Sequence, residues 1–471
     1  MAPQQTPDPR AIARWTRAVL VVFVLIGLSF GTWLSRLPAV RDHLDATTFE
    51  MSLYGLCLAA GSVVGLVISG HTVQWLGPRA ILAITLGVQA LALPGAVAII
   101  LEGWIPLGLI VLFAYGFAFS TADVAMNVSG ANAERALGRP RLPLMHAGYS
   151  IGTVAAMGLG ALAEAAGLPV QLHFVLVFVA VLLVAAAVLP LLPGDEQGVR
   201  EAAEAQADGL PAGRHPDPVD VTGPIPVIAS TAGVEPATAA VTGPISLIPS
   251  EAASPEDGDR PGRAAAASAP SAPGRGYSPW RDPRILVIGT IALATGIVEG
   301  TASDWLPLAL VDGRGVGNEI GTLVLGVFFA SIMAVRLAGA FILERLGRVA
   351  ALRLSAVLAT AGILTVILVP GHLAIVLGAI AWGLGSGLGW PIAIAAAADR
   401  RETAVRGVAA VSALGYASML IGPMAFGFLG EHIGLLNAFW ALLLFTALGG
   451  VLAHAARERR SAPVGNGVGS R

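Results

Sequence analysis

The sequence lacks lysine, contains one cysteine and carries little charge for its length. Only 12% of its 471 residues are charged, and the 28 basic residues are all arginine. A soluble domain averages about 25% charged residues, so this chain has too few charges to cover a water-facing surface of its size. A single thiol, Cys57, excludes an intrachain disulfide, an iron–sulfur cluster and a cysteine-bound zinc site.

Motifs of enzymes and of nucleic-acid-binding proteins are also missing. A P-loop needs a lysine that the chain does not have, and neither a metal-spaced histidine pair nor a Gly-x-Ser-x-Gly turn occurs. The net charge of −2 offers no attraction toward nucleic acid. We therefore expect no enzymatic activity, no cofactor, no metal site and no nucleic-acid partner.

Long apolar runs dominate the chain instead. Hydrophobic residues make up 55% of it, and the mean hydropathy is +0.75. About 20 predominantly apolar residues span a bilayer as a helix, which satisfies every backbone hydrogen bond internally. Twelve such runs are predicted, over residues 15–35, 52–73, 80–100, 105–127, 144–166, 170–192, 285–306, 319–342, 349–369, 373–397, 407–429 and 434–456. The sequence therefore predicts an all-α membrane protein, embedded in the lipid bilayer, with twelve transmembrane helices.

The first run follows several arginines, as the apolar part of a signal peptide would. No small-residue cleavage site comes after it, and the segment Trp33-Leu34-Ser35-Arg36-Leu37-Pro38 continues into a predicted turn outside the membrane. We therefore interpret residues 15–35 as a helix of the mature protein.

Arginine placement predicts the orientation in the membrane. Seventeen arginines lie in short segments on the side of the amino terminus, whereas three, Arg36, Arg41 and Arg314, lie on the opposite side. Because arginine is enriched in short cytoplasmic loops, both termini are predicted to be cytoplasmic. We expect a multi-pass protein of the plasma (cytoplasmic) membrane, present as a monomer.

Residues 193–284 separate the sixth run from the seventh. This segment is rich in Pro, Ala, Gly, Asp and Glu and nearly free of aromatic residues until Tyr277 and Trp280. Such a composition buries too little apolar surface to offset the entropy of ordering, so we predict a disordered cytoplasmic linker. Its near-repeat, VTGPI at 221–225 and 241–245, is either slippage within a linker or a docking or phosphorylation motif.

The two parts of the chain that flank this linker match each other. The predicted organisation is a tail 1–14, a six-helix bundle 15–192, the linker 193–284, a six-helix bundle 285–456 and a tail 457–471. Three short motifs recur in order at offsets of 272, 270 and 267 residues: Trp33-Leu34 with Trp305-Leu306, Trp75-Leu76-Gly77 with Arg345-Leu346-Gly347, and Gly148-Tyr149 with Gly415-Tyr416. This pattern indicates two parallel, pseudo-symmetric repeats that face each other across a central cavity.

These features resemble the major facilitator superfamily, which carries a Gly-x-x-x-Asp-Arg-x-Gly-Arg turn after helix 2 and again after helix 8. The second copy here is Glu344-Arg345-Leu346-Gly347-Arg348, with Ala340 at the first glycine position. The first copy keeps Gly70, Gly77 and Arg79 but has lost the acid. The resemblance implies that both copies form an inner gate motif.

Within the superfamily the chain is similar to the MosC and YbjJ type of membrane protein. The segments that carry this similarity are Thr32–Val40, Asp123–Asn127, Glu134–Pro140, His146, Glu299-Gly300 and Asp304-Trp305. The resemblance implies a secondary transporter that works by alternating access, and we expect a small polar solute, sugar-like or polyol, coupled to protons.

Two alternatives remain open. Helix 4 lacks the arginine, and helix 5 the Gly-Pro pair, that mark many drug/proton antiporters of the superfamily. Proton-driven efflux of drug-like molecules is therefore the second hypothesis within transport. Outside transport, a membrane sensor or scaffold that docks partners through the central linker is the alternative.

Few ionisable residues lie within the predicted helices, where a charge costs at least about 2.5–3.5 kcal/mol and usually has a function or a partner. Glu299 in helix 7 is predicted to couple transport to protons; alternatively it is a structural carboxylate bonded to a neighbouring helix. Arg36 and Asp304, at the outer ends of helices 1 and 7, are predicted to pair as an outer gate. Alternatively, each of these two side chains reaches interfacial water independently.

A further group of residues is predicted to line the substrate cavity: Trp33, Asp123, Asn127, Trp305, Arg336, Trp382 and Trp390. Tryptophan rings suit ring-bearing solutes, although tryptophan is also enriched at bilayer interfaces. Asp123 and Asn127 share one face of helix 4, where they alternatively form part of an inner gate. Arg336 is expected to pair with Asp123, Asp399 or Glu344.

Overall fold

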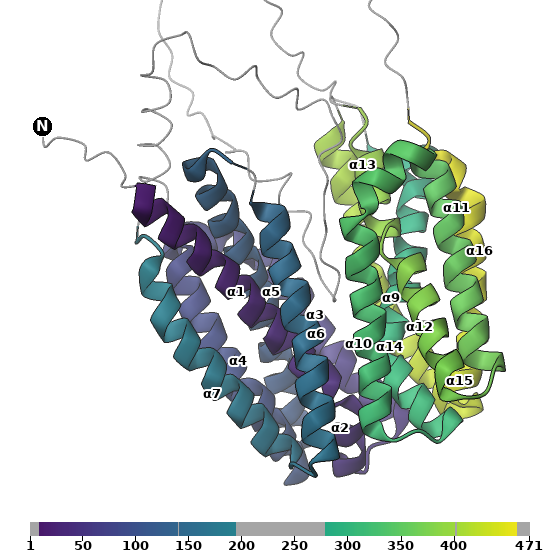
Figure 1. The fold of residues 1–471 in the computed structure, drawn as a ribbon, viewed down its shortest axis with the longest axis horizontal. Helices are drawn as coiled ribbons and strands as arrows, with labels where there is room; N and C mark the ends of the chain where they lie inside the picture. Colours follow the sequence, from purple (N-terminus) through teal and green to yellow (C-terminus); the bar gives the residue numbers. More distant parts are fainter. Residues whose placement is uncertain (1–8, 140, 195–277, 401–402, 459–471) are drawn as a thin grey trace, which may run out of the picture.

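The structure, a computed structural model, describes residues 9–139, 141–194, 278–400 and 403–458. Within these ranges the chain is almost entirely helical and contains no strand. The helices form two bundles that lie side by side (Figure 1). Residues 1–8, 195–277 and 459–471, which include most of the predicted tails and linker and the whole VTGPI repeat, lie outside the described residues.

Six long helices and one short one make up the first bundle. Its elements are α1 (Pro9–Ser35), α2 (Leu37–Leu44), α3 (Thr48–Leu76), α4 (Pro78–Leu101), α5 (Ile105–Leu137), α6 (Leu142–Ala165), α7 (Val170–Val188) and the 3₁₀ turn η1 (Leu189–Leu191). The short α2 occupies the place where a turn was predicted. Pro38 in its first turn and the left-handed Asp45 (φ 48°) after its last residue set its two ends.

The second bundle repeats this plan with more breaks. Its elements are η3 (Pro279–Arg281), α9 (Pro283–Arg314), α10 (Asn318–Leu337), α11 (Gly339–Leu368), α12 (His372–Ser386), α13 (Gly389–Ala397), α14 (Ala404–Ile433), α15 (Leu435–Ala438), η4 (Phe439–Ala441), α16 (Leu442–Leu452) and η5 (Ala453–Ala456). Helix α11 bends at Gly347, whose φ is +70°. Two predicted helices are divided in the structure: 373–397 into α12 and α13, and 434–456 into α15, η4, α16 and η5.

Among the described residues, eleven segments are long and apolar enough to cross a membrane, with α12 and α13 counted as one segment and α15 to η5 as another. The twelfth predicted span corresponds to α6, which contains Gly, Ser, Thr, Tyr and His among its 24 residues and is not one of these eleven. At 1.5 Å per residue α6 is about 36 Å long, enough to cross the hydrocarbon core. The prediction of an all-α membrane protein built from two six-helix bundles is confirmed.

Helix packing confirms the pseudo-symmetry of the two bundles. In the first bundle α1 packs on α6, and both α3 and α4 pack on α5. The corresponding contacts of the second bundle join α9 with α14, and α10 and α11 with α12. Between the bundles, α6 packs on α10 and α3 on α14, which are equivalent pairs under the same symmetry.

Glycine allows the closest of these contacts. A Cβ atom added at Gly152 of α6 would overlap the main-chain oxygen of Val24 in α1, and one added at Gly27 of α1 would overlap the main-chain oxygen of Tyr149 in α6. The two backbones therefore touch directly. Such contacts replace the hydrophobic driving force that helices lack within lipid.

Two faces of the molecule need names. The face where α1 begins, η1 ends, α9 begins and η5 ends is called the terminal face, and the opposite face is called the α2 face (Figure 1). The two bundles approach each other at the α2 face and splay apart toward the terminal face (Figure 1).

Candidate functional site

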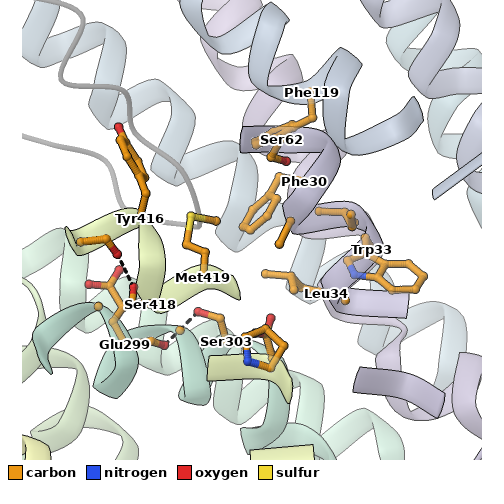
Figure 2. Close-up of a pocket in the computed structure, with 18 of the residues that line it drawn as sticks. Phe30, Trp33, Leu34, Ser62, Phe119, Glu299, Ser303, Tyr416, Ser418 and Met419 are labelled. Atoms are coloured by element: carbon orange, nitrogen blue, oxygen red, sulfur yellow. Dashed lines mark hydrogen bonds between the residues drawn. The ribbon is translucent and has the colours of Figure 1, made fainter. Parts of the chain in front are cut away.

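A cavity lies between the bundles, and both contribute to its wall (Figure 2). It contains about 1000 Å³ of space outside the protein atoms, including the part open to solvent. The first bundle contributes Phe30, Trp33 and Leu34 of α1, Gly55, Leu58, Ala59 and Ser62 of α3, and Phe119 of α5. The second contributes Gly296, Glu299, Gly300, Ser303 and Asp304 of α9, Trp390 of α13, and Gly415, Tyr416, Ser418, Met419 and Pro423 of α14. A mostly apolar and aromatic wall with a few polar groups is typical of a small-molecule site.

The break between α12 and α13 shapes one side of this cavity. Gly387 and Leu388 interrupt the helix within a glycine-rich run, and Trp390 follows directly in α13 and lines the cavity. Because the helix stops here, the main-chain oxygen of Gly387 is available to accept a hydrogen bond from Nε of Arg336 at 3.0 Å. The side chain of Arg336 thus supplies the donor for a main-chain oxygen at the break.

Glu299 of α9 and Arg336 of α10 form an ion pair at 3.3 Å between carboxylate and guanidinium. Both are buried, with exposed fractions of 8% and 6%. Two of the partners predicted for Arg336 were wrong: Asp399 pairs with Arg284 and Arg348, and Glu344 is exposed at the terminal face. The chain of contacts from Glu299 through Arg336 to Gly387 connects α9, α10 and the break before Trp390.

Arg36 does not pair with Asp304, contrary to the predicted outer gate. Its guanidinium points back into the first bundle, where it pairs with Glu164 of α6 at 3.1 Å and donates to the main-chain oxygen of Leu168 at 2.8 Å. Burial lowers the pKa of Arg36 below its ordinary value, and the nearby charge of Glu164 offsets only part of this shift. Asp304 lines the cavity instead of closing its mouth.

A different set of contacts joins the bundles at the α2 face. Arg41 of α2 pairs with Asp312 of α9 at 2.7 Å. Asn318 of α10 donates to Asp42 at 3.0 Å and to Glu164 at 3.1 Å. Three further bonds cross the same boundary: Thr322 donates to the main-chain oxygen of Ser35, the main-chain N–H of Phe49 donates to Glu431, and Ser52 donates to the sulfur of Met424. These contacts hold the α2 face closed.

Asp312→Asn is expected to shift the conformational equilibrium toward an open α2 face. The Arg41–Asp312 pair is partly exposed, so its removal destabilises the closed α2 face by about 0.2–1 kcal/mol. Spin labels at exposed Asp45 and His372, in a Cys57→Ser background, measure the separation of the bundles at this face. A broader and longer distance distribution in the variant is the expected result. Glu319→Gln, which removes a nearby acid outside the interbundle contacts, serves as the control, and identical distributions in all three proteins contradict the gate.

The four predicted cavity tryptophans divide into two pairs. Trp33 and Trp390 line the cavity. Trp382 lies in the interior of the second bundle, where its ring packs edge-on against Phe328 and Phe439 and its Nε1 donates to the main-chain oxygen of Val298 at 3.2 Å. Trp305 is 2% exposed and lies outside the cavity wall.

Asp123 and Asn127 also lie outside the cavity wall. They occupy the half of α5 nearer the terminal face, and Nδ2 of Asn127 donates to the main-chain oxygen of Asp123 one turn earlier at 3.0 Å. Asp123 is buried within the first bundle. Neither residue lines the cavity as predicted, and the residue of α5 that does, Phe119, lies one turn before Asp123.

The two copies of the predicted inner gate motif lie at turns of the terminal face. In the second copy Gly347 adopts φ +70°, Arg348 pairs with Asp399 at 2.7 Å, and Arg345 lies over the ring of Phe341. In the first copy Gly77 adopts φ +79° and Arg79 donates to the main-chain oxygen of Leu192, while Gly70 has open space around it. These contacts stay within each bundle.

Several cavity residues were not predicted, among them Phe30, Ser62, Phe119, Ser303, Tyr416 and Met419. In a soluble helix, polarity separates the two faces, but a membrane helix is apolar on the lipid side and on the core side. Ser62, Ser303 and Tyr416 carried a usable signal, because polar groups in a membrane helix turn away from lipid.

Comparison with known proteins agrees with this architecture. A family model of the Major Facilitator Superfamily matches residues 141–400 and 318–470. The uncharacterized transporter y4wD of Sinorhizobium fredii (strain NBRC 101917 / NGR234) is 28% identical over 450 residues, which cover 94% of this chain and 98% of the relative. Membrane protein MosC of Rhizobium meliloti is 29% identical over 174 residues, which cover 37% of this chain and 42% of MosC.

Solved structures share the fold. The nucleoside transporter NupG superimposes with a TM-score of 0.63 at 13% identity, covering 94% of this chain and 98% of NupG. The D-xylose–proton symporter superimposes with a TM-score of 0.61 at 12% identity, covering 94% and 97%. Because the family model covers well over half of the sequence, the chain belongs to the Major Facilitator Superfamily of membrane transporters.

Proposed function

We propose that the protein is a secondary active transporter that moves a small polar solute, sugar-like or polyol, by alternating access coupled to protons. The observation that carries this proposal is the cavity between two pseudo-symmetric repeats, which polar contacts join at the α2 face and which splay apart at the terminal face. Rocking of the repeats about the cavity exposes it to each side in turn.

The terminal face is proposed to be cytoplasmic, because most short-loop arginines of the chain belong to it. The protein is then a multi-pass component of the plasma membrane, with both termini inside, and acts as a monomer. In this orientation the splayed terminal face corresponds to an inward-facing conformation. The residues 193–284 connect the repeats on the cytoplasmic side.

The chemistry of the cavity supports a solute with hydroxyl groups and an apolar face. Aromatic rings of Phe30, Trp33 and Trp390 offer stacking surfaces. Ser62 and Ser303 also belong to the wall, where their hydroxyls donate to the main-chain oxygens of Gly116 and Glu299 and keep acceptor capacity. The wall contains carboxyl groups but no arginine or histidine, so it disfavours an anionic solute. The structural neighbours are named as a nucleoside transporter and a sugar–proton symporter, which fits a hydroxylated ring compound.

The apolar share of the wall favours one alternative, efflux of drug-like molecules. Phe30, Leu34, Phe119, Met419 and Pro423 could contact an amphipathic compound as well as a sugar ring. Direct transport measurements separate the two hypotheses. They also separate both from a scaffold that acts through the central linker.

Purified protein in liposomes is expected to accumulate at least one of D-xylose, D-glucose, myo-inositol, mannitol or uridine when the lumen is more alkaline than the medium. Radiolabelled solute inside the vesicles is the measurement. Accumulation of ethidium when the lumen is instead more acidic than the medium, as proton antiport requires, with no uptake of the five solutes under either gradient, supports the efflux alternative and contradicts the proposal. A chain lacking residues 200–275 is expected to keep uptake, whereas a scaffold transports nothing in either form.

A cavity-blocking variant gives this assay its control. Gly300 lines the cavity and has no atom within 4 Å of an added Cβ, so Gly300→Trp is expected to fill the space without disturbing helix packing and to reduce uptake to the level of empty liposomes. Gly87 of α4 also has open space and lies between exposed Ile84 and Val88, so Gly87→Trp is expected to retain uptake.

A further inference from the structure

Asp304 differs from every other acid near the cavity. It lies on α9, five residues after Glu299, which is about 7.5 Å along the helix and about 140° around it. Glu299 can therefore reach Arg336 on α10, while Asp304 is turned away from that arginine. Part of the surface of Asp304 remains exposed, and this surface belongs to the cavity between the bundles.

Within the described part of the chain, Asp304 has neither an ion pair nor a hydrogen bond. The arginines around α9 are committed elsewhere: Arg36 to Glu164, Arg41 to Asp312, Arg336 to Glu299, and Arg314 to the main-chain oxygen of Val366. The other ionisable groups of the cavity wall are Glu299 and Tyr416. Near the α2 face, the packed helices carry the acids Asp42 of α2, Glu50 of α3, Glu319 of α10 and Glu431 of α14. Their two histidines, His43 of α2 and His432 of α14, are exposed and bond to Gln171 and to the main-chain oxygen of Phe428.

An ionised carboxylate in this position has no counter-charge within a membrane interior. The free-energy penalty of such a charge is removed most simply by binding a proton. Glu299 does not need this step, because Arg336 already neutralises it. Of the two carboxyl groups in the wall, Glu299 is thus paired with a guanidinium, whereas Asp304 faces no positive charge.

We infer that Asp304, rather than Glu299, is the proton-binding site of the transporter, and that Glu299 is a positioning residue held by Arg336. The step is a simple protonation: one carboxylate oxygen of Asp304 takes a proton from water on one side of the membrane and returns it to water on the other. No electron transfer is involved. This inference rests on the proposed function and replaces the sequence-based assignment of proton coupling to Glu299.

Protonation explains why a neutral solute fits the cavity. With Asp304 neutral and Glu299 paired, the wall has no net charge, and the Asp304 carboxyl can both donate and accept a hydrogen bond toward a solute hydroxyl. With solute bound and water displaced, an ionised Asp304 would leave an uncompensated negative charge in the closed cavity, so the loaded carrier closes readily only when Asp304 is protonated. After solute and proton leave, water refills the cavity and solvates the carboxylate, so the empty carrier returns without a proton. This difference between the loaded and the empty carrier couples the proton to the solute.

Infrared difference spectroscopy of the whole protein in lipid tests this inference without any solute. Between about pH 6 and pH 9 ordinary carboxyl groups are ionised, so the carbonyl stretch of a protonated carboxyl group identifies an unusual one. The expected result is such a band in the wild type, its loss in Asp304→Asn and its retention in Glu299→Gln. Asp123→Asn, which alters another buried acid, is expected to keep the band.

Three outcomes overturn the inference: a band that persists in Asp304→Asn, a band that disappears in Glu299→Gln, or the absence of any band in the wild type. If Asp304→Asn fails to fold, isotope labelling of the wild type replaces it. A shift of the band on labelling aspartate carboxyls with carbon-13, kept in Asp123→Asn, supports Asp304, whereas a shift on labelling glutamate contradicts it. Because the spectra read proton binding alone, they remain informative even if the liposome assay finds no transported sugar, polyol or nucleoside.

Discussion

Arg336→Met is expected to destabilise the protein by about 3–5 kcal/mol, the usual effect of removing one partner from a buried ion pair. The substitution leaves the Glu299 carboxylate uncompensated at 8% exposure and leaves the main-chain oxygen of Gly387 without its donor. The flexible methionine side chain fills much of the volume of the arginine methylene groups. The stability lost in the variant is therefore due mainly to the missing charge. Thermal and denaturant unfolding in lipid nanodiscs measure the change.

The double variant Glu299→Gln/Arg336→Met provides the control for this prediction. It removes both charges, so much of the stability lost in Arg336→Met is expected to return. Glu299→Gln alone is expected to have an effect intermediate between those of the wild type and Arg336→Met, because the arginine keeps its bond to Gly387. Equal destabilisation in the single Arg336 variant and the double variant contradicts an energetic coupling between these residues.

Gly152→Ala is expected to destabilise the first bundle by about 1–3 kcal/mol, because the added Cβ overlaps backbone rather than a movable side chain. The nearest atoms are the main-chain oxygen of Val24 and the main-chain nitrogen of Leu28, both in α1. Helices α1 and α6 must separate to admit the methyl group, and this movement weakens the contacts along their whole length. Unfolding temperature and detergent-extracted yield are the measurements.

Gly158→Ala in the same helix is the matched control. Gly158 has no atom within 4 Å of an added Cβ, so the change is expected to be neutral or slightly stabilising through higher helix propensity. Loss of stability in both variants to the same extent shows that helix α6 needs glycine for its conformation and not for close approach to α1.

Most of the fold could be predicted because lipid imposes a simple rule. Each segment that crosses the bilayer must be a helix, and long apolar runs such as 170–192 identify these segments directly. Even α6, which contains several polar residues, was predicted at 144–166 from its length and its flanking residues. Helix breaks were harder, because the glycines around Gly387 permit a break without requiring one.

The candidate site was predicted only in part. Trp33, Trp390, Glu299 and Asp304 do line the cavity, whereas Trp382 lies in the interior of its own bundle. A tryptophan in an apolar helix has similar sequence neighbours whether it lines a cavity or packs inside its own bundle. The sequence therefore does not distinguish the two positions. The sequence also did not determine which acid pairs with each arginine. Arg36 pairs with Glu164 on α6 and not with the predicted Asp304 on α9.

The amino-acid sequence by itself determined the solvent in which this chain folds, the number of its membrane helices and the duplication that pairs them. These properties depend on the order of apolar and polar residues along one dimension, to which a bilayer responds directly. Only the tertiary structure decided which charges neutralise each other and which one faces the cavity alone. That outcome depends on the rotation of each helix about its axis, and the packing of small residues such as Gly27 and Gly152 against neighbouring backbones sets this rotation.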